Sequence, residues 1–254
     1  LFSRAKKSGK GCVLFVHGLG EHIGRYDQLF ELFNNEGFHC IGVDHYGHGK
    51  SPGKRGDIPN FSYFGKEIDA MDKFCRKEFG EIPVLLYGHS LGGNIALNYL
   101  LENHFDLAVI SAPWLKLDNP VASIAKKLTG MLSNVVPSLT LPNGLDPKGI
   151  SSDPQEVKKY REDPLIHDRI SVRLFHQADT SAKRILSEAE KIKTPLLLMH
   201  GTADPITSHL GTKEFAAANP AYIDFRLFPG MRHELHHEMS REAVFNSIQS
   251  YINQ

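Results

Sequence analysis

The chain has 254 residues, of which 41% are hydrophobic and 23% are charged, and both fractions are ordinary for a globular protein. Its 29 Lys and Arg residues balance its 29 Asp and Glu residues, so the formal net charge is zero. Nucleic-acid binding and acidic tails need a strong field of one sign. The composition therefore predicts a globular protein with no nucleic-acid partner, built as one domain or as one domain with an insertion.

The three cysteines, Cys12, Cys40 and Cys75, are an odd number and no two of them have CxxC spacing. They predict neither a disulfide framework nor a cysteine–zinc site, so a reducing, cytoplasmic compartment is expected. Cys12 and Cys40 lie in apolar runs and are interpreted as small core residues. No apolar run approaches the ~18 residues that a membrane span needs. The opening segment, LFSRAKKSGKG, is too short and too polar for a signal peptide.

Short apolar runs alternate with amphipathic stretches along most of the chain. In chain order, the pattern predicts a strand at 12–16, a helix at 26–35, a strand at 38–43, a helix at 61–79, a strand at 84–87, a helix at 91–102, strands at 107–110 and 195–199, a helix at 208–218, a strand at 222–228 and a helix at 240–252. Residues 1–5 are a candidate for one further edge strand. Near-continuous apolar strands separated by helices indicate an α/β fold with a mostly parallel, doubly wound sheet covered on both faces.

This alternation stops between residues 113 and 190, where Pro and Gly are frequent and helical periodicity is present without a clear strand. One helical stripe is formed by apolar residues: Val121, Ile124, Ala125, Leu128, Leu132 and Val135. The region is too long for an ordinary loop. We predict a mobile, largely helical cap, or lid, at 113–190, inserted into a core made of residues 1–112 and 191–254.

The strongest motif is GHSLG at residues 88–92, which has the spacing Gly-x-Ser-x-Gly. It follows the strand predicted at 84–87 and precedes the helix predicted at 91–102, which is the context that a nucleophile elbow requires. Glycines at 88 and 92 let the backbone bend sharply, and the start of the helix directs N–H groups toward the site. We therefore predict that Ser90 is a catalytic nucleophile.

A serine nucleophile needs a base and an acid that orients the base, and on this fold they follow the serine in the order acid, histidine. Asp204 comes after the strand predicted at 195–199, and His233 comes after the strand predicted at 222–228. We predict that these two residues complete the triad with Ser90. The alternatives are other residues near strand ends or beyond the last strand: Asp44, Asp106, His236 and His237.

An oxyanion hole needs two backbone N–H donors. The first is expected at Leu91, directly after the nucleophile. The second is expected in the loop HGLG (17–20) after the first central strand, at the N–H of Leu19. A plain glycine turn is the alternative for this loop.

Five segments are similar to the monoacylglycerol lipase and lysophospholipase group of α/β-hydrolases: HGLGEHIGRY (17–26), DHYGHGKS (44–51), GHSLGG (88–93), HGTADPIT (200–207) and GMRHELHHE (230–238). The resemblance runs from about residue 12 to the end of the chain and is weakest at 115–150. It implies the same triad and oxyanion donors and no cofactor. It also implies an eight-stranded core, whose first strand is missing from this sequence, and a lid over an acyl-chain pocket.

The function implied by the resemblance is that of a serine ester hydrolase, which cleaves monoacylglycerols to free fatty acid and glycerol through an acyl-enzyme. A lysophospholipase or a general carboxylesterase is the alternative, because the lid decides substrate preference and matches poorly. A serine peptidase of the same fold is a further alternative, and it is expected to hold a free amine with acidic residues. Lys126 and Lys127, opposite the apolar stripe, indicate either a lid helix that touches a membrane or a cap helix with solvated lysines.

Two motifs resemble other kinds of site. HELHH at residues 233–237 matches the zinc-protease motif H-E-x-x-H, but its first histidine lies in a loop and no third ligand follows, so we predict no metal. The glycines at 18, 20 and 24, with Asp44 about 20 residues on, imitate a dinucleotide fingerprint. The third glycine comes one residue late, and the Glu-His pair within the loop opposes a pyrophosphate, so a cofactor-dependent oxidoreductase is not expected.

The alcohol side of the ester is expected to meet three polar residues. Glu21 and Arg25 follow the oxyanion donor Leu19, and His236 follows His233. A glycerol group has two free hydroxyls, and burying each of them unpaired costs ~1–3 kcal/mol. We predict that Glu21, Arg25 and His236 bind these hydroxyls, and the resemblance implies the same positions. The alternative for Glu21 and Arg25 is that they pair with each other and brace the loop.

Overall fold

The computed structural model describes residues 1–6, 9–118 and 132–254. Its central sheet is formed by seven strands: β1 (Phe2–Ser3), β2 (Gly11–Val16), β3 (Phe38–Gly42), β4 (Val84–His89), β5 (Leu107–Ser111), β8 (Leu196–Gly201) and β9 (Ile223–Phe228). They are ordered β1-β3-β2-β4-β5-β8-β9, with β1 antiparallel to β3 and the other pairs parallel. All strands predicted from the apolar runs are present, and β1 is the predicted edge strand.

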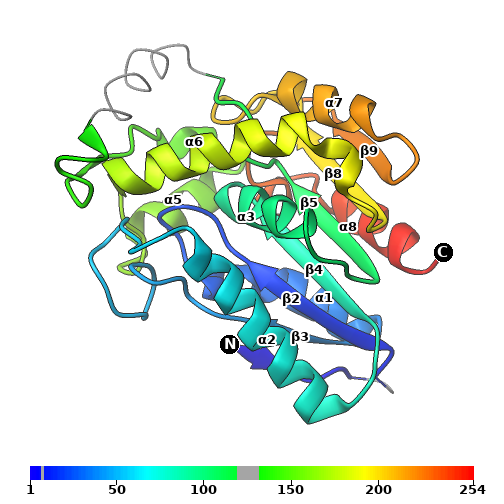
Figure 1. Cartoon of the computed structure of the whole chain (residues 1–254). Helices are drawn as coiled ribbons and strands as arrows, with labels where there is room; N and C mark the ends of the chain where they lie inside the picture. Colours follow the sequence, from blue (N-terminus) through cyan, green and yellow to red (C-terminus); the bar gives the residue numbers. More distant parts are fainter. Residues whose placement is uncertain (7–8, 119–131) are drawn as a thin grey trace.

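Helices cover both faces of this sheet (Figure 1). They are α1 (Asp27–Asn35), α2 (Ser62–Phe79), α3 (Leu91–Leu100), α6 (Val172–Ser187), α7 (His209–Ala218) and α8 (Arg241–Ile252). Successive side chains of a strand point to opposite faces. Leu14 of β2 accordingly joins a core cluster with α2, α3, α6 and α7, whereas Val13 and Phe15 join a second cluster with α1 and α8. The predicted doubly wound α/β fold is confirmed.

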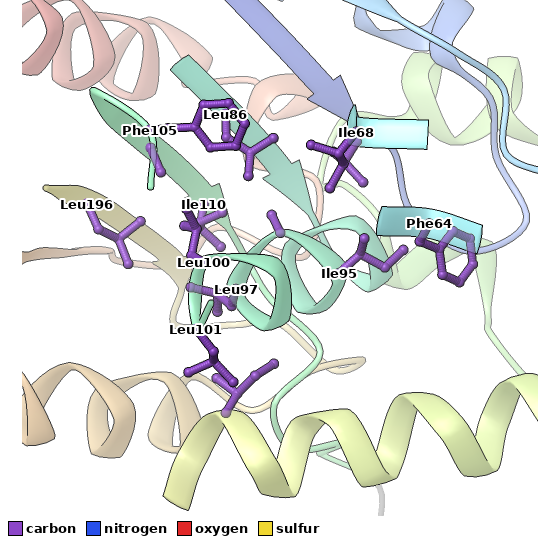
Figure 2. Packing of buried hydrophobic residues seen from close by; sticks show 14 of the residues in the cluster. Phe64, Ile68, Leu86, Ile95, Leu97, Leu100, Leu101, Phe105, Ile110 and Leu196 are labelled. Carbon is purple, nitrogen blue, oxygen red and sulfur yellow. The ribbon is translucent and has the colours of Figure 1, made fainter. Parts of the chain in front are cut away.

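The first cluster fixes the position of α3 between the sheet and α6 (Figure 2). Its side chains include Phe64, Ile68, Leu86, Ile95, Leu97, Leu100, Leu101, Phe105, Ile110 and Leu196. Full burial of one such side chain contributes about 1.5–3 kcal/mol to stability. Because Ser90 directly precedes α3, this packing also holds the predicted nucleophile in place.

The region between β5 and β8 contains more regular structure than its sequence indicates. It includes α5 (Pro154–Glu162) and two short strands, β6 (Thr140–Pro142) and β7 (Arg169–Ser171), which pair antiparallel. The expectation of no strand here was wrong, because a three-residue strand is too short to show alternation. Most of the apolar stripe at 121–135 and both Lys126 and Lys127 lie outside the described residues.

Short 3₁₀ helices join these elements near the ends of the strands: η1 (Ile23–Tyr26), η2 (Pro147–Gly149), η3 (Ala189–Lys191) and η4 (Leu235–His237). The chain around η2 contacts the loop after β9 through two backbone hydrogen bonds. The N–H of His233 donates to the carbonyl of Gly149, and the N–H of Glu234 donates to the carbonyl of Ile150. Part of the predicted cap is therefore fastened to the core.

We expect the rate of amide hydrogen exchange to differ between two segments of the region 113–190. The amides of α6 should exchange nearly as slowly as those of β4, because Leu174, Ala178 and Ile185 lie in the same core cluster as the sheet. The exposed amides of 132–139 should exchange faster. Exchange measured by mass spectrometry on peptides from both segments checks this, and fast exchange throughout α6 would contradict it.

Candidate active site

Ser90 lies on a strained turn between β4 and α3. Its φ of 56° and ψ of −118° lie in a region that residues other than glycine rarely adopt. The neighbouring glycines make the turn possible, because a Cβ on Gly92 would come within 2.0 Å of the Val16 carbonyl oxygen. A Cβ on Gly88 would lie 2.6 Å from the carbonyl oxygen of Gly92. Glycine is therefore required at 88 and 92, because the backbone packs too closely there, at the carboxyl edge of the sheet, for a side chain.

His233 and Asp204 form a hydrogen-bonded line with Ser90. The loop after β9 places Nε2 of His233 2.8 Å from the Oγ of Ser90. The loop after β8 places the Oδ2 of Asp204 2.7 Å from Nδ1 of His233. All three residues are buried, with 9% of Ser90 exposed. The structure thus brings together the three residues that the sequence predicts, which are up to 143 positions apart.

The pKa values of Asp204 and His233 are shifted by their surroundings. Burial raises the pKa of Asp204, but the charge of His233 and the hydrogen bonds from His200 and His233 outweigh burial and hold that pKa well below its usual range. Burial lowers the pKa of His233, and the adjacent Asp204 carboxylate reverses this shift, so the net change is upward. An ionised Asp204 can therefore stabilise a proton on His233 after transfer from Ser90.

The two predicted oxyanion donors flank Ser90. Leu91 is the first residue of α3, where backbone N–H groups have no partner within the helix. Leu19 lies in the loop after β2, and this loop lies against the nucleophile, since a Cβ on Gly18 would be 3.2 Å from the Cβ of Ser90. The N–H of Gly18 is held by Glu21 at 2.6 Å. Both segments therefore lie next to Ser90, and the binding of an oxyanion by the N–H groups of Leu19 and Leu91 stays a prediction.

Arg25 is the centre of a buried ion-pair network. Its guanidinium donates two hydrogen bonds to Glu234, at 2.6 and 2.7 Å, and one to Glu21 at 3.0 Å. Glu21 also accepts a hydrogen bond from the hydroxyl of Tyr26 at 2.7 Å. Burial raises the pKa of Glu234, but the charge and hydrogen bonds of Arg25 hold it well below its usual range. Among the predicted alcohol-binding residues, Glu21 and Arg25 therefore bind each other and brace the loop after β2.

His236, the third predicted alcohol-binding residue, is 1% exposed. Neither of its ring nitrogens has a hydrogen-bond partner among the described residues. The ring stacks on Tyr26 with centroids 5.1 Å apart, and it lies 5.4 Å from the ring of His89, which in turn is 4.8 Å from that of His233. The ring of His89 therefore separates His236 from the predicted base, and both buried nitrogens of His236 lack a hydrogen-bond partner among the described residues.

The HELHH segment does not form a metal site in this structure. Both ring nitrogens of His233 belong to the line with Ser90 and Asp204. His237 uses Nδ1 on Glu234 and Nε2 on the carbonyl oxygen of Arg25. Across 1–6, 9–118 and 132–254, no three histidine, cysteine or acidic residues are grouped so as to hold a metal ion.

Sequence reasoning missed three residues that contact the site. Glu234 has a signal in the sequence only as a member of the zinc motif and of the segment GMRHELHHE, and its partner Arg25 lies 209 positions away. His200 and Thr207 both lie within 3 Å of the Oδ2 of Asp204. Their only signal in the sequence is that they belong to the segment HGTADPIT around Asp204.

Two buried histidines, His17 and His48, lie at the oxyanion loop, with their ring centroids 5.5 Å apart. His17 donates from Nδ1 to the Gly18 carbonyl at 2.9 Å and accepts at Nε2 from the N–H of His45 at 3.0 Å, so its contacts require the uncharged ring. Burial, followed by the nearby His45 and His48, holds the pKa of His17 well below its usual range. Burial, with His45 and His167, does the same for the pKa of His48.

We expect these histidines to make the protein less stable in acid. In the unfolded chain they bind protons as the pH falls below about 6.5, while the folded state does not, so each one removes up to about 1.4 kcal/mol per pH unit below that value. Thermal unfolding between pH 7 and pH 5 measures the loss. His48→Asn should unfold with a shallower pH dependence than the wild type, and an unchanged slope would contradict the prediction.

Within the part of the chain that the structure describes, the helices all lack the length or the apolar character needed to cross a bilayer. The three cysteines are buried and free, as small core residues would be.

The family model described as serine aminopeptidase S33 (Hydrolase_4) matches residues 7–240. The chain belongs to this family. Rat monoglyceride lipase is 31% identical over 255 residues, which cover 98% of this chain and 83% of the rat protein. An abhydrolase domain-containing protein of Dictyostelium discoideum is 32% identical over 247 residues, and the chain spans about a quarter of that protein's length.

Two solved structures are similar to this chain over almost its whole length. The crystal structure of Paleococcus ferrophilus monoacylglycerol lipase has a TM-score of 0.89 and 38% identity, covering 99% of this chain and 97% of the other. A soluble variant of Saccharomyces cerevisiae monoglyceride lipase in complex with a substrate analogue has a TM-score of 0.88 and 25% identity, with 99% and 89% covered. The predicted membership of the α/β-hydrolases is confirmed.

Proposed function

We propose that this protein hydrolyses monoacylglycerols to free fatty acid and glycerol through an acyl-enzyme on Ser90. The observation that carries the proposal is the hydrogen-bonded line from Ser90 through His233 to Asp204 at a strained strand-to-helix turn. The choice of ester is supported by relatives that are monoglyceride or monoacylglycerol lipases and match over most of their length.

The reaction follows from the geometry of this line. The Oγ of Ser90 attacks the ester carbonyl while Nε2 of His233 takes its proton, and Asp204 stabilises the imidazolium. The N–H groups of Leu19 and Leu91 bind the tetrahedral oxyanion. His233 then gives the proton to the leaving glycerol, and water hydrolyses the acyl-enzyme by the same route. No step calls for a cofactor or a metal ion.

His236 is the residue that we propose to bind the glycerol hydroxyls. Its two buried nitrogens have no hydrogen-bond partner among the described residues, and a neutral ring offers one donor and one acceptor. Glu21 and Arg25 act on this site indirectly, because their hydrogen bonds hold the loop that contains Gly18 and Leu19. In this proposal His236 contacts the glycerol directly, and Glu21 and Arg25 only hold the neighbouring loop in place.

We expect His236→Ala to lower kcat/KM for a monoacylglycerol about 10-fold more than for an aryl ester of the same acyl chain. The aryl ester has no free hydroxyls, and the loss of one hydrogen bond accounts for a factor of this size. Glu21→Gln is the matched control and should lower both rates to a similar extent, because it weakens the support of the oxyanion loop. Equal losses on both substrates in His236→Ala would show that His236 does not bind glycerol.

The alternatives to a monoacylglycerol differ in the leaving group. The Bacillus subtilis phospholipase YtpA is 28% identical over 95% of both chains, which keeps a lysophospholipid or a general carboxylic ester as the second candidate. A peptidase is disfavoured, because Glu21 and Glu234, which are buried close to the triad, are both paired with Arg25 and are not free to hold an amine.

A substrate panel tests the proposed function. Monoacylglycerols, lysophospholipids, triacylglycerols, short aryl esters and an amino-acid anilide are assayed side by side at equal concentration. We expect the highest kcat/KM for a monoacylglycerol and no release from the anilide. A higher value for a lysophospholipid, or turnover of the anilide alone, would replace the proposal with the corresponding alternative.

We further propose that the protein acts in a reducing, cytoplasmic compartment and touches membranes transiently through the cap. The free, buried cysteines support the first point. Large apolar side chains exposed on the described part of the cap support the second: Val135, Val136, Leu139 and Leu141, of which Val135 is 76% exposed. Flotation with phosphatidylcholine vesicles tests it, and Val135→Asp should reduce the bound fraction.

A further inference from the structure

The carboxylate of Asp204 has a hydrogen-bond donor at each of its four acceptor positions. Oδ1 accepts from the backbone N–H groups of Ile206, at 2.8 Å, and Thr207, at 3.1 Å. Oδ2 accepts from His233 at 2.7 Å and from Nε2 of a second histidine, His200, at 2.9 Å. An ionised carboxylate offers about four such positions. His200 and the hydroxyl of Thr207, which also lies 2.9 Å from Oδ2, therefore share the position that the triad and the backbone leave open.

The place of His200 in the fold determines which ring nitrogen faces Asp204. It lies near the end of β8 and is completely buried. Its Nδ1 lies 2.8 Å from the hydroxyl of Thr212 on α7. Nε2 lies 2.9 Å from the Oδ2 of Asp204 and 3.1 Å from the carbonyl oxygen of Thr207. Because an ionised carboxylate and a carbonyl oxygen only accept hydrogen bonds, Nε2 must hold a proton, and a neutral ring then accepts at Nδ1 from the Thr212 hydroxyl. The hydroxyl of Thr207 is shared between the Oδ2 of Asp204, at 2.9 Å, and the carbonyl oxygen of Ala112, at 3.2 Å.

We propose that His200 is a positioning residue for the hydrolysis: as a neutral ring protonated at Nε2, it holds the Oδ2 of Asp204 in line with His233 and takes up part of the negative charge of that oxygen. This inference rests on the proposed function, because it assigns His200 a role only through Asp204. His200 touches neither the nucleophile nor the substrate in this scheme.

The proposal predicts a shift in pH dependence that a purely structural role does not. Without the hydrogen bond from His200, the negative charge of Asp204 is available to His233 alone, so the His233 imidazolium is stabilised and its pKa rises further. The acid limb of kcat/KM, where His233 must be deprotonated, then moves to higher pH. A general loosening of the fold lowers the rate at every pH without moving that limb.

Other titratable groups surround the two histidines, and all of them are retained in the variants. His233 faces His89, with ring centroids 4.8 Å apart, and feels the charges of Glu21 and Glu234. His200 faces the ring of His209 on α7 at 6.3 Å. Since these groups are common to each variant, a difference between the variants reports on the donor at position 200.

The test compares His200→Leu, which removes the donor, with His200→Gln, whose amide N–H can still reach Asp204. With a short-chain monoacylglycerol, we expect His200→Leu to lower kcat about 10-fold and to move the acid limb of kcat/KM up by about half a pH unit. His200→Gln should restore the limb and most of kcat. A limb that stays in place in His200→Leu, or that moves equally in both variants, would overturn the proposal.

A measurement on the wild-type protein keeps the test decisive even if His200→Leu does not fold. The ¹⁵N chemical shifts of the labelled histidine rings should show His200 protonated at Nε2 and unprotonated at Nδ1. A proton on Nδ1 alone would point it at Thr212 and leave no donor for Asp204, which would refute the role of His200. Failure of the proposed function is recognised separately, because the wild type would then not hydrolyse the monoacylglycerol, or Ser90→Ala would hydrolyse it as fast as the wild type.

Discussion

Replacement of Ser90 by alanine is expected to lower kcat by at least about 10⁴-fold, because a triad acts as a unit and the remaining groups have no nucleophile to activate. The fold should survive the change. The position of Ser90 is set by backbone contacts of Gly88 and Gly92 and by the packing of α3, and none of these involves the Oγ atom. Hydrolysis of a monoacylglycerol, measured with thermal unfolding of the same sample, checks both points.

Chemical labelling provides the second measurement of this prediction. A serine-directed fluorophosphonate should modify the wild type at Ser90 and leave Ser90→Ala unlabelled. Ser187→Ala is the matched control, since Ser187 is exposed at the end of α6, where its hydroxyl donates to the carbonyl of Arg184. It should retain full activity and full labelling. Activity close to wild type in Ser90→Ala would remove this serine from the mechanism.

Replacement of Arg25 by methionine is expected to destabilise the fold by about 3–5 kcal/mol, because two buried carboxylates would lose their shared cation. Glu21 and Glu234 are both buried, and each accepts a hydrogen bond from Arg25. Unfolding in urea, followed by circular dichroism, measures the change. Activity should fall as well, since Glu21 also holds the N–H of Gly18 next to the oxyanion donor Leu19.

Two further variants show whether the loss comes from buried charge. Arg76 also pairs with two carboxylates, Asp72 and Glu81, but its side chain is 43% exposed, so Arg76→Met should cost less than about 1 kcal/mol. Adding Glu234→Gln to Arg25→Met should recover part of the lost stability, because one of the two buried carboxylate charges that lost their cation is then removed. Equal costs for Arg25→Met and Arg76→Met would show that the buried network is not important for stability.

Much of the fold could be predicted from the sequence because the relevant signals are local. A parallel strand buried on both faces reads as a short apolar run, so β2, β4, β5 and β8 were each visible without tertiary information. The three-residue strands β6 and β7 were missed, since three residues give no measurable alternation. The extent to which 113–190 is fastened to the core was also missed, because it depends on contacts such as the hydrogen bond between His233 and Gly149.

The sequence by itself determined which residues form the line of the candidate site. Ser90 is marked by glycines that the turn requires, and Asp204 and His233 are marked by chain order at the ends of parallel strands, which meet at one edge of the sheet. Only the tertiary structure decided how the other polar residues are used. Arg25 meets Glu234 across 209 positions, His200 and Thr207 share the last acceptor position of Asp204, and His236 has no hydrogen-bond partner among the described residues. These outcomes depend on how loops from distant parts of the chain share a limited number of buried donors and acceptors, and no local pattern in the sequence records that arrangement.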